Sequence, residues 1–294
     1  MLNVAAGAAS LSPERALAIH DACGSASQAG NLEWLARDKA FDIPFDGDAD
    51  AVTAALRQTV HDEWLLDVNI VRSLNRRKKL LIADMDSTIV GCECIDELAD
   101  FVGLKPKVAA ITERAMRGEL DFPSALRERV ALLKGLPLEA MARVYSERVK
   151  LNPGAKELTA TMRANGGYAL LVSGGFTYFT KRVAAEAGFD SQQGNILADD
   201  GTALTGRVEE PILGREAKLE ALETTVARLS WSTDDALAVG DGANDLDMIK
   251  RAGMGVAYHA KPVVAAAAGA SIVHGDLTGL LYLQGYRDDE IRKN

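Results

Sequence analysis

From about residue 77 onward, short apolar runs alternate with amphipathic helical patterns, and this alternation constrains the fold more than any other feature. The runs are almost continuously apolar, as expected of strands buried on both faces of a parallel sheet. They lie at 79–84, 168–175, 235–242, 255–260 and 271–274. Helical patterns lie between them, at 154–166, 177–188, 215–229 and 244–253. This order predicts an α/β fold whose core is a Rossmann-like parallel sheet.

Two segments interrupt the alternation. Residues 91–150 contain no strand pattern, only three or four amphipathic helices, which predicts a helical cap inserted between the first two core strands. Residues 195–210 contain two short runs around Asp199-Asp200-Gly201, which predicts a hairpin. We therefore assign residues 76–90 and 151–294 to the core and residues 91–150 to the cap.

Residues 1–75 form a separate small α+β domain in this interpretation. Extended segments are expected at Leu2–Ala8, twice within 33–44 and at 65–71, with helices near 13–22 and 49–60. This order predicts a β-α-β-β-α-β sandwich. The acidic stretch "DGDAD" at 46–50 is not a calcium loop, because alanine and arginine stand where that loop requires glycine and glutamate.

Three of the core runs end in polar clusters: "DMDST" at 84–88, "SGG" at 173–175 and "GDGAND" at 240–245. The carboxyl ends of parallel strands meet at one rim of a sheet, which is where α/β proteins bind ligands. We therefore expect the clusters to meet, with Lys218 beside them. Each of these four features alone, the three clusters and Lys218, is more often an ordinary loop or surface residue. All four in this order, each at the edge of a strand or helix, are hard to explain as unrelated loops.

The predicted rim concentrates negative charge, because Asp84, Asp86, Asp241 and Asp245 would share a small space. Such a cluster is strongly unfavourable without a positive partner. A hard divalent cation with oxygen ligands removes the conflict, and few carboxylates together with a phosphate suit Mg²⁺.

The other rim residues suit the phosphate itself. The Ser173 hydroxyl, the neighbouring glycine backbone and the Lys218 ammonium are all groups that bind phosphate oxygens. One aspartate can attack phosphorus, and a second, two residues further on, can protonate the leaving oxygen and then activate water.

Other function classes lack support in the sequence. The formal net charge of −9, from 33 basic and 42 acidic residues, argues against a nucleic-acid or polybasic membrane surface. "GDGAND" lacks the third glycine of a dinucleotide fingerprint, and neither a P-loop nor a nucleophile elbow is present.

No apolar stretch approaches the length of a membrane span, and no signal peptide is recognisable. Three cysteines without disulfide or zinc spacing favour a reduced, cytoplasmic protein.

On these motifs the chain resembles the haloacid-dehalogenase superfamily of phosphohydrolases, from about residue 78 to 286. The stretches "DSTIVGCECIDELA", "AMRGELDF", "LRERVALLKGLP" and "VSGGF" resemble the branch of that superfamily that acts on phosphoserine. The resemblance implies Mg²⁺-dependent hydrolysis of O-phospho-L-serine to serine and phosphate through an aspartyl-phosphate, the last step of serine biosynthesis. It also implies that residues 1–75 resemble the ACT fold, a small regulatory-type domain.

The resemblance also implies roles for individual residues. Asp84 would be the nucleophile and Asp86 the acid and base. The Mg²⁺ ligands would be the carboxylates of Asp84 and Asp241 and the backbone carbonyl of Asp86, with Asp245 supporting the metal site from behind. The residues that would hold phosphate and substrate are Glu93, Met116, Phe122, Arg129, Ser173, Gly174, Lys218 and Asn244. Among these, Glu93 would pair with the ammonium of phosphoserine and Arg129 with its carboxylate.

Two alternatives stay open at this stage. The same intermediate could pass its phosphoryl group to another alcohol such as homoserine, which would make the protein a phosphotransferase. The chain could instead be a non-catalytic amino-acid or phosphoserine sensor, although binding alone requires no second acid at Asp86. Dehalogenase or transport-ATPase chemistry is disfavoured because those relatives typically lack an aspartate there. The expected partners are a small-molecule substrate and, at most, a second copy of the chain in a homodimer, with neither nucleic acid nor membrane.

Overall fold

The computed structural model describes residues 1–7, 11–116 and 119–293, apart from the side chain of Met116. Its centre is a six-stranded sheet with the strand order β14-β13-β12-β7-β8-β9, in which every neighbouring pair is parallel. The strands are β7 (Leu80–Ala83), β8 (Tyr168–Phe176), β9 (Ser191–Asn195), β12 (Ala236–Gly240), β13 (Met254–Tyr258) and β14 (Ala270–Ile272). The predicted parallel α/β core is confirmed.

The central strand β7 shows why its sequence is apolar throughout. Leu81 and Ala83 belong to the core on one face of the sheet, and Leu80 and Ile82 belong to the core on the other. Since successive strand residues point to opposite faces, a strand covered on both sides needs apolar residues at every position.

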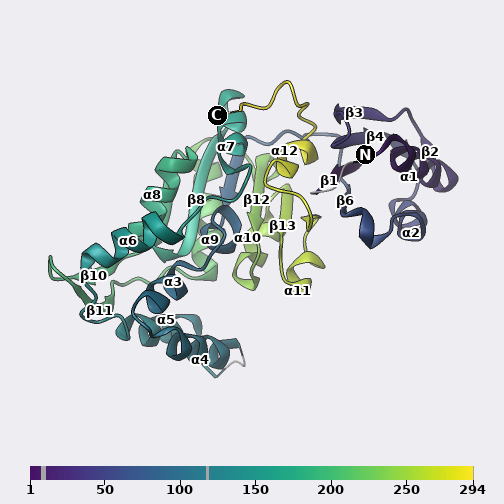
Figure 1. Ribbon diagram of the computed structural model, residues 1–294. Helices are drawn as coiled ribbons and strands as arrows, with labels where there is room; N and C mark the ends of the chain where they lie inside the picture. Colours follow the sequence, from purple (N-terminus) through teal and green to yellow (C-terminus); the bar gives the residue numbers. More distant parts are fainter. Residues whose placement is uncertain (8–10, 117–118, 294) are drawn as a thin grey trace.

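Helices cover both faces of this sheet (Figure 1). The first face packs against α7 (Ala155–Ala164), α8 (Thr177–Ala187) and α12 (Gly279–Leu283). The second packs against α9 (Arg215–Arg228), α10 (Leu246–Arg251) and α11 (Pro262–Ala265). Helix α8 ends where Gly188 adopts φ 82°, a left-handed conformation that glycine tolerates at a helix end.

The described part of residues 91–150, for which the sequence predicts three or four helices, forms four that we call the cap: α3 (Cys94–Phe101), α4 (Lys105–Met116), α5 (Phe122–Ala131) and α6 (Leu138–Arg148). The pattern expected at 108–118 runs beyond α4 into residues 117 and 118, which lie outside the described residues. The chain leaves and re-enters the core at adjacent points, since Val90 and Leu151 form an antiparallel bridge. The Gly91 N–H also donates to the carbonyl of Lys150.

The interruption at 195–210 is a hairpin, as predicted, formed by β10 (Leu197–Asp199) and β11 (Leu204–Val208). Strand β9 was not predicted. Its sequence "SQQGN" is polar, and an edge strand that is only partly buried needs no apolar run.

The N-terminal unit has its own sheet, with the antiparallel order β3-β4-β1-β6, and its own apolar core. Its elements are β1 (Leu2–Ala6), α1 (Pro13–Ala26), β3 (Glu33–Ala36), β4 (Ala40–Ile43), α2 (Ala49–Thr59) and β6 (Leu66–Ile70), with a short pair β2 (Gln28–Ala29) and β5 (Phe45–Asp46). The predicted β-α-β-β-α-β order is confirmed, although the expected strand at Leu2–Ala8 extends into residue 8, outside the described residues. Figure 1 shows this unit beside the β13 side of the core sheet, with α4 and α5 of the cap at the other end of the molecule.

Among the helices that the structure describes, none combines the length and the apolar character that crossing a membrane requires.

Substitution of a core leucine should cost far more stability than the same substitution in the linker between the two units. Leu81 is fully buried in β7, whereas Leu74 is 89% exposed. We expect Leu81→Ala to lower the free energy of unfolding by about 2–5 kcal/mol. Leu74→Ala should change it by less than about 0.5 kcal/mol. Urea denaturation of both variants checks this, and equal losses would contradict the assigned core.

Candidate active site

The site begins where β7 ends. Asp84 follows the strand directly, and its Oδ1 accepts a hydrogen bond of 2.7 Å from the N–H of Met85. The chain then turns sharply, because Asp86 is extended while Ser87 adopts the left-handed φ of 56°. This turn points the two aspartates into the space above the strand ends of β8 and β12.

A buried lysine stands at the centre of this space. Lys218, from α9, is 1% exposed, and its Nζ lies 2.8 Å from Asp84 Oδ1 and 2.7 Å from Asp245 Oδ1. Burial by itself lowers the pKa of Lys218, but the two carboxylates outweigh it and raise that pKa above its ordinary value. The lysine is therefore a permanent cation at the rim.

Three carboxylates share this rim. Asp84, Asp241 and Asp245 each offer an oxygen within 4.8 Å of the others. Burial and the charge of Asp245 raise the pKa of Asp84 well above its ordinary value and also raise that of Asp241. Because one lysine faces three carboxylates, an oxygen-seeking divalent cation would offset the remaining repulsion, and the donor set fits Mg²⁺.

Asp245 is the least available of the three. Its Oδ1 contacts Lys218 and its Oδ2 accepts the N–H of Gly242 at 3.0 Å. Both oxygens are engaged, so Asp245 is better placed to hold the lysine and the loop than to bind a cation.

Asp86 faces β8. Its Oδ2 accepts the hydroxyl of Ser173 at 3.1 Å, and its Oδ1 accepts the N–H of Cys94 at 2.9 Å. A Cβ on Gly175 would lie 2.7 Å from Asp86 Oδ2, so this position needs glycine for the strand to approach the carboxylate. Desolvation raises the pKa of Asp86, while its hydrogen bonds from Cys94 and Ser173 oppose this shift.

The cap contributes one acid and one base. Glu93, just before α3, accepts the hydroxyl of Ser87 at 2.6 Å, and burial together with the charge of Asp86 raises its pKa to about 7. Arg129, on α5, is half-buried, and its Nε donates to the carbonyl of Ala125. Among the described residues Arg129 makes no ion pair, so its guanidinium N–H groups are available for a ligand.

A cavity of about 250 Å³ lies between the cap and the rim, lined by Phe122, Gly174, Gly214, Arg215, Lys218, Ala243 and Asn244. The ring of Phe122 lies directly over Gly174, where an added Cβ would be 3.0 Å from it. This cavity therefore contains four of the residues predicted for substrate binding. Of the other four, Glu93, Arg129 and Ser173 do not line it, and Met116 has a side chain outside the described residues.

Some neighbours of the site carried no prediction. The hydroxyl of Thr88 donates to Asp241 at 3.3 Å. Ser87 contacts Glu93, and Cys94 contacts Asp86. Ser87 and Thr88 belong to the "DMDST" motif, so their position there was a usable signal. No such signal in the sequence pointed to Arg215, because it is a surface residue paired with Asp247.

The fold and the rim define a class of hydrolase. The model of the haloacid dehalogenase-like hydrolase family matches residues 81–250. The chain belongs to this family and is an enzyme, which removes the non-catalytic sensor alternative.

Several individual members of the family are similar to this chain over most of its length. The chain is 50% identical over 210 residues to the phosphoserine phosphatase of Albidiferax ferrireducens, a match that covers 70% of this chain and 89% of that protein. The crystal structure of a probable phosphoserine phosphatase from Vibrio cholerae has a TM-score of 0.80 at 32% identity, covering 98% of this chain and 87% of the other. A haloacid dehalogenase family hydrolase from Salmonella enterica serovar Typhi has a TM-score of 0.83 at 27% identity, covering 98% and 99%. Both structural matches include the N-terminal unit.

Replacing EDTA by Mg²⁺ should raise the Tm of the protein, because a bound cation offsets the repulsion among the rim carboxylates. A hundredfold excess over Kd corresponds to about 2.7 kcal/mol. Asp241→Asn should lose most of this rise. Asp247→Asn, which alters a carboxylate paired with Arg215 on the surface, should keep it. Thermal unfolding followed by circular dichroism checks this, and an equal rise in all three proteins would place the cation elsewhere.

Proposed function

We propose that the protein catalyses the Mg²⁺-dependent hydrolysis of O-phospho-L-serine to L-serine and phosphate, the last step of serine biosynthesis. The observation that carries this proposal is the pair of opposite charges on the cap. Glu93 and Arg129, which has no ion pair among the described residues, both lie close enough to Asp86 for its charge to act on them. The names of the relatives, several of which are phosphoserine phosphatases, support the same substrate.

The cap pair matches the parts of phosphoserine that are not phosphate. The ammonium of the substrate would pair with Glu93, and its carboxylate would accept a forked pair of hydrogen bonds from Arg129. Burial lowers the pKa of Arg129, while the negative charges of Asp96, Glu93 and Asp86 oppose this shift. The carboxylate of the substrate would add a direct anionic partner.

Asp84 is the proposed nucleophile. Its Oδ1 is held by Lys218 and by the N–H of Met85, which leaves Oδ2 to attack phosphorus. The bond from Oδ2 to phosphorus forms while the bond from phosphorus to the serine oxygen breaks. Lys218, Ser173 and Asn244 would hold the phosphate oxygens during transfer, with the backbone of Gly174 close enough to contact the same group.

Asp86 is the proposed acid and base. Its raised pKa lets it carry the proton that passes to the departing serine oxygen. The resulting carboxylate then takes a proton from water, whose oxygen attacks phosphorus and releases phosphate from Asp84. Both aspartates return to their starting states, and Ser173 and the Cys94 N–H keep Asp86 in position throughout.

The metal would be held by the carboxylates of Asp84 and Asp241 and the backbone carbonyl of Asp86. When bound, Mg²⁺ supplies positive charge that stabilises the phosphoryl group during transfer. Asp245 would support this site indirectly by fixing Lys218 and Gly242.

The core, the cap and the N-terminal unit would have different roles. We propose that residues 76–90 and 151–294 carry the chemistry, and that the cap at 91–150 excludes water around the substrate, with Phe122 and Met116 forming its apolar wall. A cytoplasmic location agrees with the three free cysteines. The homodimer expected for residues 1–75 stays a prediction, which sedimentation velocity tests.

Phosphate release from O-phospho-L-serine is the direct test. We expect turnover in Mg²⁺ and none in EDTA, and a loss of about a thousandfold or more in Asp84→Asn, because the nucleophile is removed. Homoserine added as acceptor tests the phosphotransferase alternative, which would yield phosphohomoserine in place of free phosphate. Turnover of p-nitrophenyl phosphate alone would retain the catalytic rim and reject phosphoserine as the substrate.

Arg129→Met should separate substrate recognition from chemistry. We expect kcat/KM for phosphoserine to fall about 100-fold or more, since the substrate carboxylate loses its partner. p-Nitrophenyl phosphate has no carboxylate, so its kcat/KM should be nearly unchanged. Arg127→Met is the matched control, because Arg127 lies on the same helix but is exposed and paired with Glu210. Equal losses for both substrates would contradict the assigned role of Arg129.

A further inference from the structure

The N-terminal unit covers the edge of the core sheet with side chains. Strand β14 pairs with β13 on one side, and β6 lies along its other side. Asn69 imitates a neighbouring strand, because its Nδ2 donates to the carbonyl of Ser271 at 2.9 Å and its Oδ1 accepts the Ser271 N–H at 2.8 Å. The edge is thereby satisfied without continuing the sheet.

Asp67, two residues earlier on the same face of β6, holds the loop that follows β14. Its carboxylate is 5% exposed and accepts three consecutive backbone N–H groups. Oδ1 accepts from Val273 at 2.7 Å and from His274 at 3.0 Å, and Oδ2 accepts from Gly275 at 2.8 Å. Successive N–H groups that converge on one anion fix the backbone that carries them.

Two glycines allow this close approach. A Cβ on Gly7 would lie 2.3 Å from the carbonyl oxygen of His274, and a Cβ on Gly275 would lie 2.9 Å from Asp67 Oδ2. The N-terminal unit and the loop therefore pack backbone against backbone, and a shift of one must shift the other.

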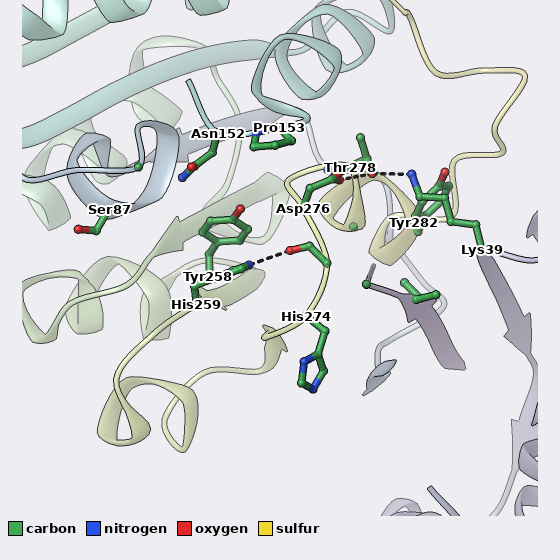
Figure 2. Close-up of a pocket in the computed structure, with 16 residues that line it drawn as sticks. Lys39, Ser87, Asn152, Pro153, Tyr258, His259, His274, Asp276, Thr278 and Tyr282 are labelled. Atoms are coloured by element: carbon green, nitrogen blue, oxygen red, sulfur yellow. Dashed lines mark hydrogen bonds between the residues drawn. The ribbon is translucent and has the colours of Figure 1, made fainter. Parts of the chain in front are cut away.

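The loop in turn holds His259. The carbonyl of Gly275 accepts a hydrogen bond of 2.8 Å from His259 Nε2, drawn as a dashed line in Figure 2. His259 is exposed and borders a cavity of about 620 Å³, so this hydrogen bond rather than burial holds its side chain. Its φ of 45° is a left-handed conformation that a residue other than glycine keeps only when its surroundings enforce it.

His259 lies next to the metal rim. Two residues further on, the N–H of Lys261 donates to the backbone carbonyl of Asp241 at 3.3 Å. Asp241 belongs to the carboxylate cluster of the candidate active site. A continuous series of contacts thus runs from Asp67 through Gly275 and His259 to the backbone of Asp241.

We propose that Asp67 is a positioning residue for the metal site. By holding residues 273–275 it fixes His259 and the loop against Asp241, so the N-terminal unit shapes the rim although it touches neither substrate nor metal. This inference rests on the proposed function, because it assumes that Asp84 and Asp241 bind a divalent cation.

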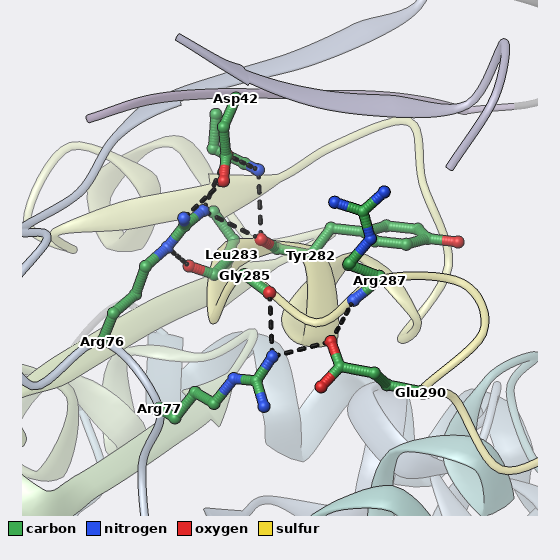
Figure 3. Close-up of polar contacts among 9 residues, drawn as sticks. Asp42, Arg76, Arg77, Tyr282, Leu283, Gly285, Arg287 and Glu290 are labelled. Carbon is green, nitrogen blue, oxygen red and sulfur yellow. Dashed lines mark hydrogen bonds and ion pairs between the residues drawn. The ribbon is translucent and has the colours of Figure 1, made fainter. Parts of the chain in front are cut away.

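A second docking point provides a matched control. Arg76 forms a forked ion pair with buried Asp42, at 2.5 and 2.8 Å, and donates to the carbonyls of Tyr282 and Leu283 (Figure 3). Asn3 donates to the same carboxylate at 2.9 Å. This network also joins the N-terminal unit to the core, but at the end of α12, away from the carboxylate rim. Asp42→Asn therefore weakens docking without breaking the series of contacts from Asp67.

The experiment measures Mn²⁺ binding to the full chain by the loss of the free-ion EPR signal. We expect Asp67→Asn to weaken Mn²⁺ binding about 3- to 10-fold. The Mg²⁺ concentration for half-maximal turnover should rise in parallel, while KM for phosphoserine at saturating Mg²⁺ stays the same. Asp42→Asn should lower Tm yet bind Mn²⁺ within about twofold of wild type. His259→Ala leaves the contacts between the N-terminal unit and the core intact, and it should also weaken Mn²⁺ binding. If Asp67→Asn fails to fold, the result with His259→Ala tests the proposal in its place.

The outcomes separate this inference from the proposed function. Wild-type protein that binds no Mn²⁺ would overturn the metal centre and this inference with it. Wild-type binding that Asp67→Asn and His259→Ala leave unchanged would overturn only the inference. An equal loss in Asp42→Asn would also overturn it, because docking as a whole, and not the contact at Asp67, would then control the rim.

Discussion

The contact between Lys218 and two buried carboxylates is the interaction on which the catalytic face depends. Asp84 follows β7, Asp245 directly precedes α10, and Lys218 comes from α9, so the ammonium connects three separate elements. Removing Lys218 would leave two buried carboxylates without their cation. In the proposed mechanism the same contact would direct the chemistry, because Lys218 engages Oδ1 of Asp84 and leaves Oδ2 for the attack on phosphorus.

The N-terminal unit is joined to the core by apolar packing, in which Ala5, Leu35 and Ala40 belong to the buried cluster of the core, and by polar contacts at its edge. Asp67 and Asn69 replace the strand that β14 lacks, and Asp42 meets Arg76 beside the end of α12. An open sheet edge invites aggregation, so this cover protects the core as well as attaching the unit. Because one of these contacts reaches the loop behind Asp241, attachment and active-site geometry are linked.

Most of the architecture could be predicted from local patterns. The continuous apolar run at β7 and the amphipathic helices of the cap are properties of neighbouring residues, so they can be read without a structure. Strand β9 could not, because "SQQGN" is polar and its strand conformation depends on pairing with β8. The docking role of Asp67 was equally hidden, since its partners lie more than 200 residues away in sequence.

The sequence by itself determined the parallel core, the inserted cap and the set of residues at the rim, because strand ends of a parallel sheet must meet on one side. Only the tertiary structure decided which partners the atoms of each rim residue contact. It occupies both oxygens of Asp245, gives Arg129 no ion pair within the described part of the chain and brings Asp67 against the loop at 273–275. These features depend on distances between side chains from different elements, and no local pattern in the chain encodes such distances.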